Sequence, residues 1–562
     1  MKRLGCALIV AGFALFSPFS TYADAKHGYA VASAHPLATN AGLSILEKGG
    51  NAFDAAVAVS AALAVVEPYH SGLGGGGFWL LHLEKDQKNI FIDGREAAPL
   101  AATKDMYLDG LGNIKADLSL NGPLAAAIPG MPAAITYMAK HYGRLPLKET
   151  LAPAIALAEE GFAVDYQYMT FIQMTDRLKQ LSLYPAASQQ FLNHGKPYAL
   201  GEILKQPDLA KTLRAIAASG HDGFYKGDVA QKLVNAVVKA GGIWSLKDLN
   251  DYQVKIREPL VGAYHNMLVV TAPPPSAGGV ALLTSLNILS HFSSQTETKA
   301  QWIHDIIEAM RLSYWQRTQY LADPDFVKVP VEKLISMENA NQLLPNIKHN
   351  EATPSQLLTK PPQNASLNPS NTTHFSIMDK DGNRVSATLS INYIFGSSFV
   401  AAGTGVLLND EMDDFTTKVG AQNVFGLVGG EANSIAPGKR PVSSMTPTFL
   451  EMPNRIAILG TPGGSRIATM VLLGCLSFFD YGGAISIVSA MRFHHQYMPD
   501  WVEYEPETFS PALVSELTAM GYKLNPLTAY YGDMQAITWE KLTGVITAAS
   551  DPRHIGMAAV VN

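Results

Sequence analysis

Helical spacing of apolar residues dominates the first half of the chain. Between residues 37 and 66, alanine and aliphatic residues recur three or four positions apart, and Gly49-Gly50-Asn51 interrupts the series. A glycine-rich break in a helical pattern is typical of two helices joined by a turn. The same criteria predict further elements, with helices at 150–240, 278–292 and 300–320 and strands at 78–83 and 266–271.

The spacing changes after a polar segment at residues 343–371. This segment is rich in Pro, Asn, Ser, Thr and Lys and has little periodicity, which predicts a surface loop. From Thr373 onward apolar and polar residues alternate, and the alternation resumes after Asp381-Gly382-Asn383, which predicts a β-hairpin. The hairpin therefore opens directly behind a loop, at the pair Thr372-Thr373.

The N-terminal sequence predicts export. The chain begins Met-Lys-Arg, an apolar run of sixteen residues continues to Phe19, and small residues stand at Ala23 and Ala25. The run contains Pro18 and is shorter than the ~20 apolar residues that a spanning helix needs. We therefore expect a cleavable signal peptide over residues 1–25, a periplasmic or secreted product, and no membrane span after the signal peptide is removed.

Composition and charge narrow the function classes. The chain has 562 residues, of which 47% are hydrophobic and 16% charged, and its formal net charge is -6. The apolar fraction supports a large core, and length alone would allow three domains. The slightly acidic balance argues against binding to nucleic acid, which favours a basic face. Beyond Cys6 in the signal peptide the sequence holds only Cys475, so we expect no intramolecular disulfide.

Several common catalytic motifs do not occur in the sequence. The glycine run at 74–77 lacks the Gly-Lys-Ser/Thr of a phosphate-binding loop and is better explained by a tight turn with close backbone packing. His494 and His495 would point apart on a helix or strand, which favours a packed, hydrogen-bonded pair over metal ligands. No convincing Gly-x-Ser-x-Gly elbow is found. We expect no metal and no cofactor.

Hydroxyls, carboxylates and paired glycines gather in the hundred residues after Thr372. A threonine hydroxyl is a weak nucleophile, but a free α-amino group on the same residue, with a reference pKa near ~8, can act as its base. This chemistry requires a cut before the threonine. A Gly-Gly turn can present backbone N–H groups to an oxyanion. The same spacing also fits a β-sheet whose outward Thr and Ser residues merely decorate the surface.

Long, ordered motifs carry a family resemblance from about residue 28 to residue 553. They are GGNAFDAA (49–56), GLGGGGF (72–78), DGREAAP (93–99), TTHFS (372–376), LNDEMDDF (408–415), RPVSSM (440–445) and GTPGGSR (460–466). With these motifs the chain resembles the γ-glutamyltranspeptidases, which belong to the N-terminal nucleophile hydrolase superfamily. The resemblance implies an α/β (α+β) fold, a four-layer αββα sandwich.

The resemblance also implies a precursor that cuts itself between Asn371 and Thr372. The products would be a large subunit (26–371) and a small subunit (372–562), which form one catalytic domain. The polar loop before Asn371 fits this expectation, because the new chain ends must separate. With one cysteine left after export, packing and hydrogen bonds must hold the subunits together.

Individual roles follow from the matching motifs. Thr372 would be the nucleophile, and Ser390, where bacterial relatives often have threonine, would hydrogen-bond to it. Glu411 stands where bacterial relatives often have glutamine. Phe425 would act as an aromatic gate in a lid loop at residues 416–440. The remaining expected roles are an oxyanion hole from Gly463 and Gly464, α-carboxylate binding by Arg95, Ser443 and Ser444, and α-ammonium binding by Asn392, Glu411 and Asp414.

The leading hypothesis is a γ-glutamyl transferase and glutathione hydrolase. A γ-glutamyl compound would acylate Thr372, and water, an amino acid or a dipeptide would take the acyl group. Two alternatives remain open: an acylase of the same fold that acts on β-lactam side chains, and a periplasmic binding protein that keeps the pocket without catalysis.

Overall fold

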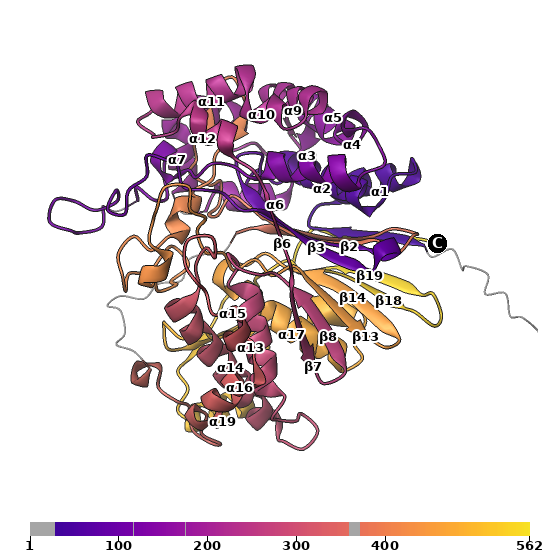
Figure 1. Cartoon of the computed structure of the whole chain (residues 1–562), viewed down its shortest axis with the longest axis vertical. Coiled ribbons are helices and arrows are strands. Elements are labelled where there is room, and N and C mark those ends of the chain that lie inside the picture. Colours follow the sequence, from indigo (N-terminus) through magenta and orange to yellow (C-terminus); the bar gives the residue numbers. More distant parts are fainter. Residues whose placement is uncertain (1–27, 116, 175, 359–370) are drawn as a thin grey trace, which may run out of the picture.

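The computed structural model describes residues 28–115, 117–174, 176–358 and 371–562, and the expected signal peptide lies outside this part of the chain. Two antiparallel sheets lie face to face at its centre, and a layer of helices covers the outer face of each (Figure 1). This is the four-layer αββα arrangement that the family resemblance implied. Among the described residues, no helix is both long and apolar enough to cross a membrane.

Strands from both ends of the chain build the first sheet. Its order is β20-β1-β9-β10-β2-β3-β6, and all neighbours are antiparallel. The predicted hairpin is confirmed as β9 and β10, with Leu389 opposite Thr373. The bounds are β20 Met557–Val561, β1 Tyr29–Ser33, β9 Thr373–Met378, β10 Arg384–Ser390, β2 Gly76–Leu83, β3 Lys88–Gly94 and β6 Lys255–Arg257.

The second sheet has the order β19-β18-β14-β13-β8-β7 and is also antiparallel throughout. Its strands are β19 Ile546–Ser550, β18 Gln535–Glu540, β14 Arg455–Gly460, β13 Thr448–Met452, β8 Met267–Thr271 and β7 Leu260–Tyr264. Short strands elsewhere are β4 Phe162–Ala163, β5 Ile203–Leu204, β11 Val400–Ala401, β12 Val406–Leu407, β15 Phe493–His494, β16 Val502–Tyr504 and β17 Leu524–Pro526.

The two faces of the β9–β10 hairpin differ in chemistry. Its apolar residues pack into the helical layer above the first sheet. The polar residues between them face the second sheet and are buried: His374 Nδ1 lies 2.8 Å from Thr388 Oγ1, and Ser386 Oγ donates to the Leu459 carbonyl at 3.0 Å. Burial lowers the pKa of His374 to about 3. The alternative in which these Thr and Ser residues decorate an outer surface is therefore wrong.

Helices α1 (Pro36–Glu47) and α2 (Ala52–Val66) are the predicted pair at residues 37–66. Asn51 begins α2 with a capping box, because its side chain accepts from Asp54 N while Asp54 Oδ2 accepts from Asn51 N, both at 3.0 Å. The other helices of this half of the molecule are α3 Met131–Tyr142, α4 Leu147–Thr150, α5 Ala152–Glu160, α6 Tyr166–Ile172, α7 Arg177–Leu183, α8 Pro185–Phe191, α9 Pro207–Ser219, α10 Asp222–Tyr225, α11 Gly227–Lys239 and α12 Leu246–Asp251.

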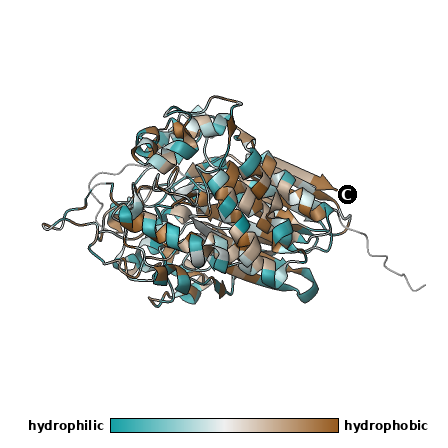
Figure 2. Ribbon diagram, turned by 90° about the horizontal axis from the view of Figure 1, so that it is seen from above, coloured by the Kyte–Doolittle hydropathy of each residue, from teal (hydrophilic) through white to brown (hydrophobic). Residues whose placement is uncertain are grey.

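The second helical layer covers the other sheet (Figure 1). Figure 2, which looks down on the first helical layer, shows hydrophilic residues alternating with hydrophobic ones along its helices. The predicted helix at 278–292 ends earlier, at Leu289, and the predicted helix at 300–320 is confirmed. In the predicted loop, short 3₁₀ turns occur before residue 358, and residues 359–370 lie outside the described part. The helices are α13 Gly278–Leu289, α14 Lys299–Tyr320, α15 Val331–Leu334, α16 Met337–Leu343, α17 Ile467–Phe479, α18 Ala484–Ser489 and α19 Pro511–Ala519.

Candidate active site

Thr372 and Ser390 meet because they stand at the same end of the β9–β10 hairpin. Thr372 directly precedes β9, and Ser390 is the last residue of β10. Their hydroxyl oxygens are 3.3 Å apart, and Ser390 Oγ also accepts from the Asn392 backbone N–H at 2.9 Å. Either hydroxyl can be the donor between Thr372 and Ser390, because Ser390 Oγ keeps both its proton and a second lone pair.

The backbone at Thr372 is strained. Its φ is +136°, a region that β-branched residues rarely occupy. The preceding residue is fixed, because Asn371 is buried and its side-chain amide donates to the Tyr69 carbonyl. Such backbone strain costs on the order of 1–3 kcal/mol and persists only where the surroundings impose it. The strained torsion is therefore that of the Thr372 N–Cα bond, next to the peptide bond where cleavage is expected.

The glycine pair Gly463-Gly464 lies in the turn between β14 and α17. Gly463 has a φ of +148° and Gly464 a φ of +54°, conformations that glycine adopts without penalty. A Cβ on Gly463 would lie 2.3 Å from Met470 Cε, the movable end of a flexible side chain, so the backbone conformation rather than the space requires glycine. Gly464 lines the same cavity as Thr372, whereas Gly463 is not one of the residues that line it.

A buried ion cluster forms the other end of the site. Arg95 donates through Nη1 to Glu411 Oε1 and through Nη2 to Asp414 Oδ2. Two backbone carbonyls hold the same guanidinium, that of Pro441 at 3.2 Å from Nε and that of Val442 at 3.1 Å from Nη2. The arginine is thus oriented from four directions.

Burial and charge act in opposite directions on this cluster. Burial disfavours the charged form of Arg95, but the carboxylates of Glu411 and Asp414 outweigh it and raise the pKa of the guanidinium. Burial raises the pKa of Glu411 well above its usual range, against the opposing effect of Arg95. For the neighbouring Glu96 burial likewise raises the pKa, to about 7. The cluster is therefore a set of partly compensated charges in a site of low polarity.

The residues expected to bind the α-carboxylate and the α-ammonium group line one cavity, whose free space is about 20 Å³. Phe425, in the loop predicted to be a lid, also lines this cavity, and Gln496 Nε2 donates to its backbone carbonyl at 3.2 Å. The predicted residues that line the cavity are Thr372, Ser390, Gly464, Arg95, Asn392, Glu411, Asp414, Phe425, Ser443 and Ser444.

Three neighbours that the sequence analysis did not single out support these residues. Glu96 lies 3.6 Å from Arg95 Nη1. The Asp410 backbone carbonyl accepts from Asn392 Nδ2 at 3.0 Å, and Asn423 Nδ2 donates to Asp414 Oδ1 at 2.9 Å. Glu96 and Asp410 belong to motifs 93–99 and 408–415, so the motifs carried the signal, although nothing in the spacing separated these residues from their neighbours.

The structure also tests the predictions made for the histidine pair and the glycine run, and it places Cys475. The two histidines are buried and point to different partners, His494 to Thr469 Oγ1 at 2.9 Å and His495 to Asp500 at 3.3 Å, which confirms the packed pair. The glycine run 74–77 packs tightly as predicted, since a Cβ at Gly74 would lie 2.0 Å from the Leu407 carbonyl. Cys475 is a buried, free thiol in α17.

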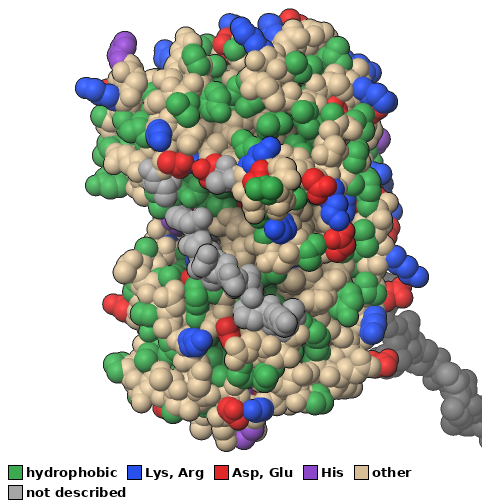
Figure 3. Space-filling view, turned by 90° about the vertical axis from the view of Figure 1, so that its left-hand side faces the viewer, with side chains coloured by type: hydrophobic (Ala, Val, Ile, Leu, Met, Phe, Trp, Pro, Cys, Tyr) green, Lys and Arg blue, Asp and Glu red, His purple; other side chains and the backbone are tan. Residues whose placement is uncertain are grey.

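Figure 3 shows the face that carries the lid; it is hollowed at mid-height, where acidic and basic side chains gather around the depression. This hollow lies between the two halves of the molecule, each of which contributes one helical layer. The site residues come from both sequence halves: Arg95 follows β3 of the first sheet, and the glycine pair follows β14 of the second.

Comparison with known proteins adds independent evidence. The sequence matches the family model described as Gamma-glutamyltranspeptidase over residues 38–561. It is 43% identical over 526 residues to a glutathione hydrolase proenzyme of Pseudomonas sp. (strain A14), which covers 92% of this chain and 90% of that protein.

The solved structures that are similar to this chain include the following two. A cephalosporin acylase from Bacillus halodurans has a TM-score of 0.82 at 28% identity and covers 97% of this chain and 99% of that chain. A γ-glutamyltranspeptidase chain from Helicobacter pylori has a TM-score of 0.56 at 41% identity and covers 58% of this chain and 94% of that chain.

Proposed function

Because the chain belongs to the γ-glutamyltranspeptidase family, we propose that it is a glutathione hydrolase and γ-glutamyl transferase made as a self-cleaving proenzyme. One observation carries the proposal: Thr372 and the Arg95–Glu411–Asp414 cluster line the same cavity. A hydroxyl nucleophile and a paired set of opposite charges in one cavity suit a zwitterionic amino-acid head with an amide at its far end.

Recognition of the head would be an exchange of ion pairs. The α-carboxylate takes Arg95, assisted by Ser443 and Ser444, and the α-ammonium takes Glu411 and Asp414, assisted by Asn392. Arg95 exchanges two carboxylates of the protein for that of the substrate, while Glu411 and Asp414 exchange Arg95 for the ammonium group. Each charge of the protein therefore keeps a partner of opposite charge. The cavity is filled by the present pairs, and entry therefore requires Arg95 to release the carboxylates and the Phe425 lid to move.

The reaction follows from the opposite end of the cavity. After cleavage before Thr372, its freed α-amino group accepts the hydroxyl proton, and Oγ1 attacks the γ-carbonyl carbon. The carbonyl oxygen becomes an oxyanion, for which backbone N–H groups at Gly463 and Gly464 are the expected donors. The C–N bond then breaks, the amine leaves with the proton, and a γ-glutamyl ester remains on Thr372. In the second step of the reaction, water, an amino acid or a dipeptide attacks this ester and releases the glutamyl group from Thr372.

The strained backbone at Thr372 supports a cut between Asn371 and Thr372. Attack of the Thr372 hydroxyl on the Asn371 carbonyl would replace the peptide bond next to this strained torsion by an ester, which water then hydrolyses. The products would be the large subunit 26–371 and the small subunit 372–562 in one catalytic domain. Export through the 1–25 segment to the periplasm or medium completes the proposed maturation.

The two alternatives receive less support. A β-lactam side-chain acylase has no use for Glu411 and Asp414, and identity is higher with the glutathione hydrolase than with the acylase structure. A binding protein without catalysis leaves the strained Thr372 and its contact with Ser390 without a role.

The decisive experiment is the variant Thr372→Ala, with Thr543→Ala on an exposed turn as control. We expect the first to remain a single chain with no activity on a γ-glutamyl anilide. We expect Thr543→Ala, like the wild type, to yield a small subunit whose mass, measured by mass spectrometry, equals that of a chain that starts at Thr372. A cut and active Thr372→Ala protein would overturn the proposal.

A further inference from the structure

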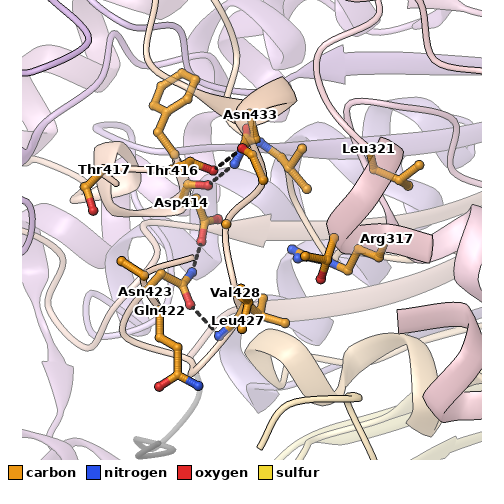
Figure 4. A pocket seen from close by; sticks show the side chains of 16 residues that line it. Arg317, Leu321, Asp414, Thr416, Thr417, Gln422, Asn423, Leu427, Val428 and Asn433 are labelled. Carbon is orange, nitrogen blue, oxygen red and sulfur yellow. Dashed lines mark hydrogen bonds between the residues drawn. The ribbon is translucent and has the colours of Figure 1, made fainter. Parts of the chain in front are cut away.

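A second cavity lies behind the lid, next to the first (Figure 4). The C-terminal half of α14 forms one wall, and lid residues 416–433 form the other. Asp414 and Leu427 line both cavities, so these two residues lie between the two spaces. The free space of the second cavity is about 20 Å³.

Arg317 of α14 points toward this space from the helix side, facing Val428 and Asp414 in Figure 4. Its Nε is buried without a hydrogen-bond partner, although the side chain as a whole is only partly buried, and within the described part of the chain its guanidinium has no ion pair. Two buried arginines near the centre are different: Arg440 pairs with Asp93, and Arg466 with Glu503. A buried cationic donor without a partner is unusual, because buried polar groups are normally hydrogen-bonded.

The one carboxylate that lines the cavity is already engaged. Asp414 Oδ2 accepts from Arg95, and Oδ1 accepts from Asn423. On the lid side a second donor, Nε2 of Gln422, is also buried without a partner. The cavity thus presents two unsatisfied donors, one of them cationic, and no free acidic partner for them among its lining residues.

We propose that this cavity is a binding subsite for a small monovalent anion, a halide or a single carboxylate group, with Arg317 as its principal ligand. The proposal goes beyond the γ-glutamyl reaction and does not depend on it. A forked guanidinium suits a carboxylate, and the limited space excludes larger anions. The unsatisfied donors require a ligand with negative charge, and the small cavity limits the size of that ligand.

The anion would connect the lid to α14. The two are already close, since a Cβ at Gly430 of the lid would lie 2.3 Å from the Thr318 carbonyl of α14. An anion held by Arg317 and by polar lid groups would add a tie across this contact. We therefore expect the bound anion to stabilise the closed lid and to lower the KM for a donor that the lid retains.

Two sources can supply such an anion. It can come from solution, or it can be a carboxylate carried by the donor. The cavity adjoins Asp414 and Val442 at the Arg95 end of the site, away from Thr372, where a leaving group and an acceptor would lie. A donor would therefore have to carry the extra carboxylate as an extension of its α-carboxyl group.

The first arm of the test measures melting temperature and needs no activity. Sodium formate and chloride are compared with sodium gluconate, which is too large, at equal ionic strength. For an anion from solution we expect a saturable rise of roughly 1–3 °C in the wild type. The rise should be absent in Arg317→Met, partly retained in Arg317→Lys, and unchanged in Arg214→Met, a control at an exposed arginine of α9.

The second arm measures KM for a simple γ-glutamyl anilide and for the γ-anilide of glutamyl-α-glycine. A formate-dependent fall in KM that Arg317→Met abolishes supports a free anion. A severalfold rise in KM for the extended donor alone, in Arg317→Met, supports a carboxylate carried by the donor. If formate shifts the melting temperature equally in wild type and Arg317→Met, and both KM values change in parallel, the proposal is overturned.

Discussion

The ammonium-binding role proposed for Asp414 leads to a quantitative prediction. In Asp414→Asn, Arg95 keeps Glu411 and two backbone carbonyls, so its position should hold. What disappears is one charged partner for the α-ammonium. A hydrogen bond to a charged group contributes about 1.5–3 kcal/mol. We therefore expect kcat/KM for a γ-glutamyl anilide to fall roughly 10- to 150-fold.

The assay compares two donors that differ by a single group. A glutaryl anilide lacks the α-amino group but keeps the carboxylate that Arg95 would bind. The kcat/KM for the glutaryl anilide should change only a few-fold in Asp414→Asn. This donor has no ammonium group to lose, so the variant can affect it only by disturbing the position of Arg95. Asp208→Asn, at an exposed position of α9, is the matched control. Equal losses for both donors would refute the assignment of Asp414 to the ammonium group.

Three further predictions concern other parts of the site and the core. Ser390→Ala should lower kcat about 10- to 100-fold and slow self-cleavage, because the hydrogen bond to Thr372 is lost. Ser390→Thr should keep both kcat and self-cleavage near the wild-type rates. A fully active Ser390→Ala protein would contradict the role of Ser390. Gly460→Ala should destabilise the protein by about 1–3 kcal/mol, because its Cβ would lie 2.3 Å from the His374 ring, whereas Gly483→Ala has open space and should be neutral in denaturant unfolding. Burial lowers the pKa of His494 to about 3, so as the pH falls below about 6.5 the unfolded chain takes up a proton that the folded chain does not. The unfolding free energy of the wild type relative to His494→Gln should therefore decline by about 1.4 kcal/mol per pH unit toward pH 3. A difference in unfolding free energy that does not depend on pH would exclude this.

The sequence predicted local elements where one pattern decides the structure. The glycine-asparagine break at 49–51 became the start of α2 because the asparagine could cap a helix without help from distant residues. The hairpin formed for a similar reason, since alternation and a tight turn are local signals.

The polar residues of that hairpin show where local patterns fail. Ser376 and Ser386 look like surface residues in the sequence, yet both are buried because a second sheet, from other parts of the chain, supplies carbonyl partners at Gln535 and Leu459. Arg317 gave no signal for a related reason. Its isolation depends on which side chains surround it in space, and helix periodicity does not record that.

The strand order of the two sheets has a consequence for the mature protein. β1 lies between β20 and β9, β2 pairs with β10, and β8 pairs with β13. A cut before Thr372 would assign the two members of each of these pairs to different polypeptides. Neither polypeptide could then depart without opening continuous ladders of backbone hydrogen bonds on both sides of the molecule. The two products would therefore remain associated and unfold as one cooperative unit, whereas a product made alone would expose unpaired edges at β1, β2 and β8 or at β9, β10, β13 and β20.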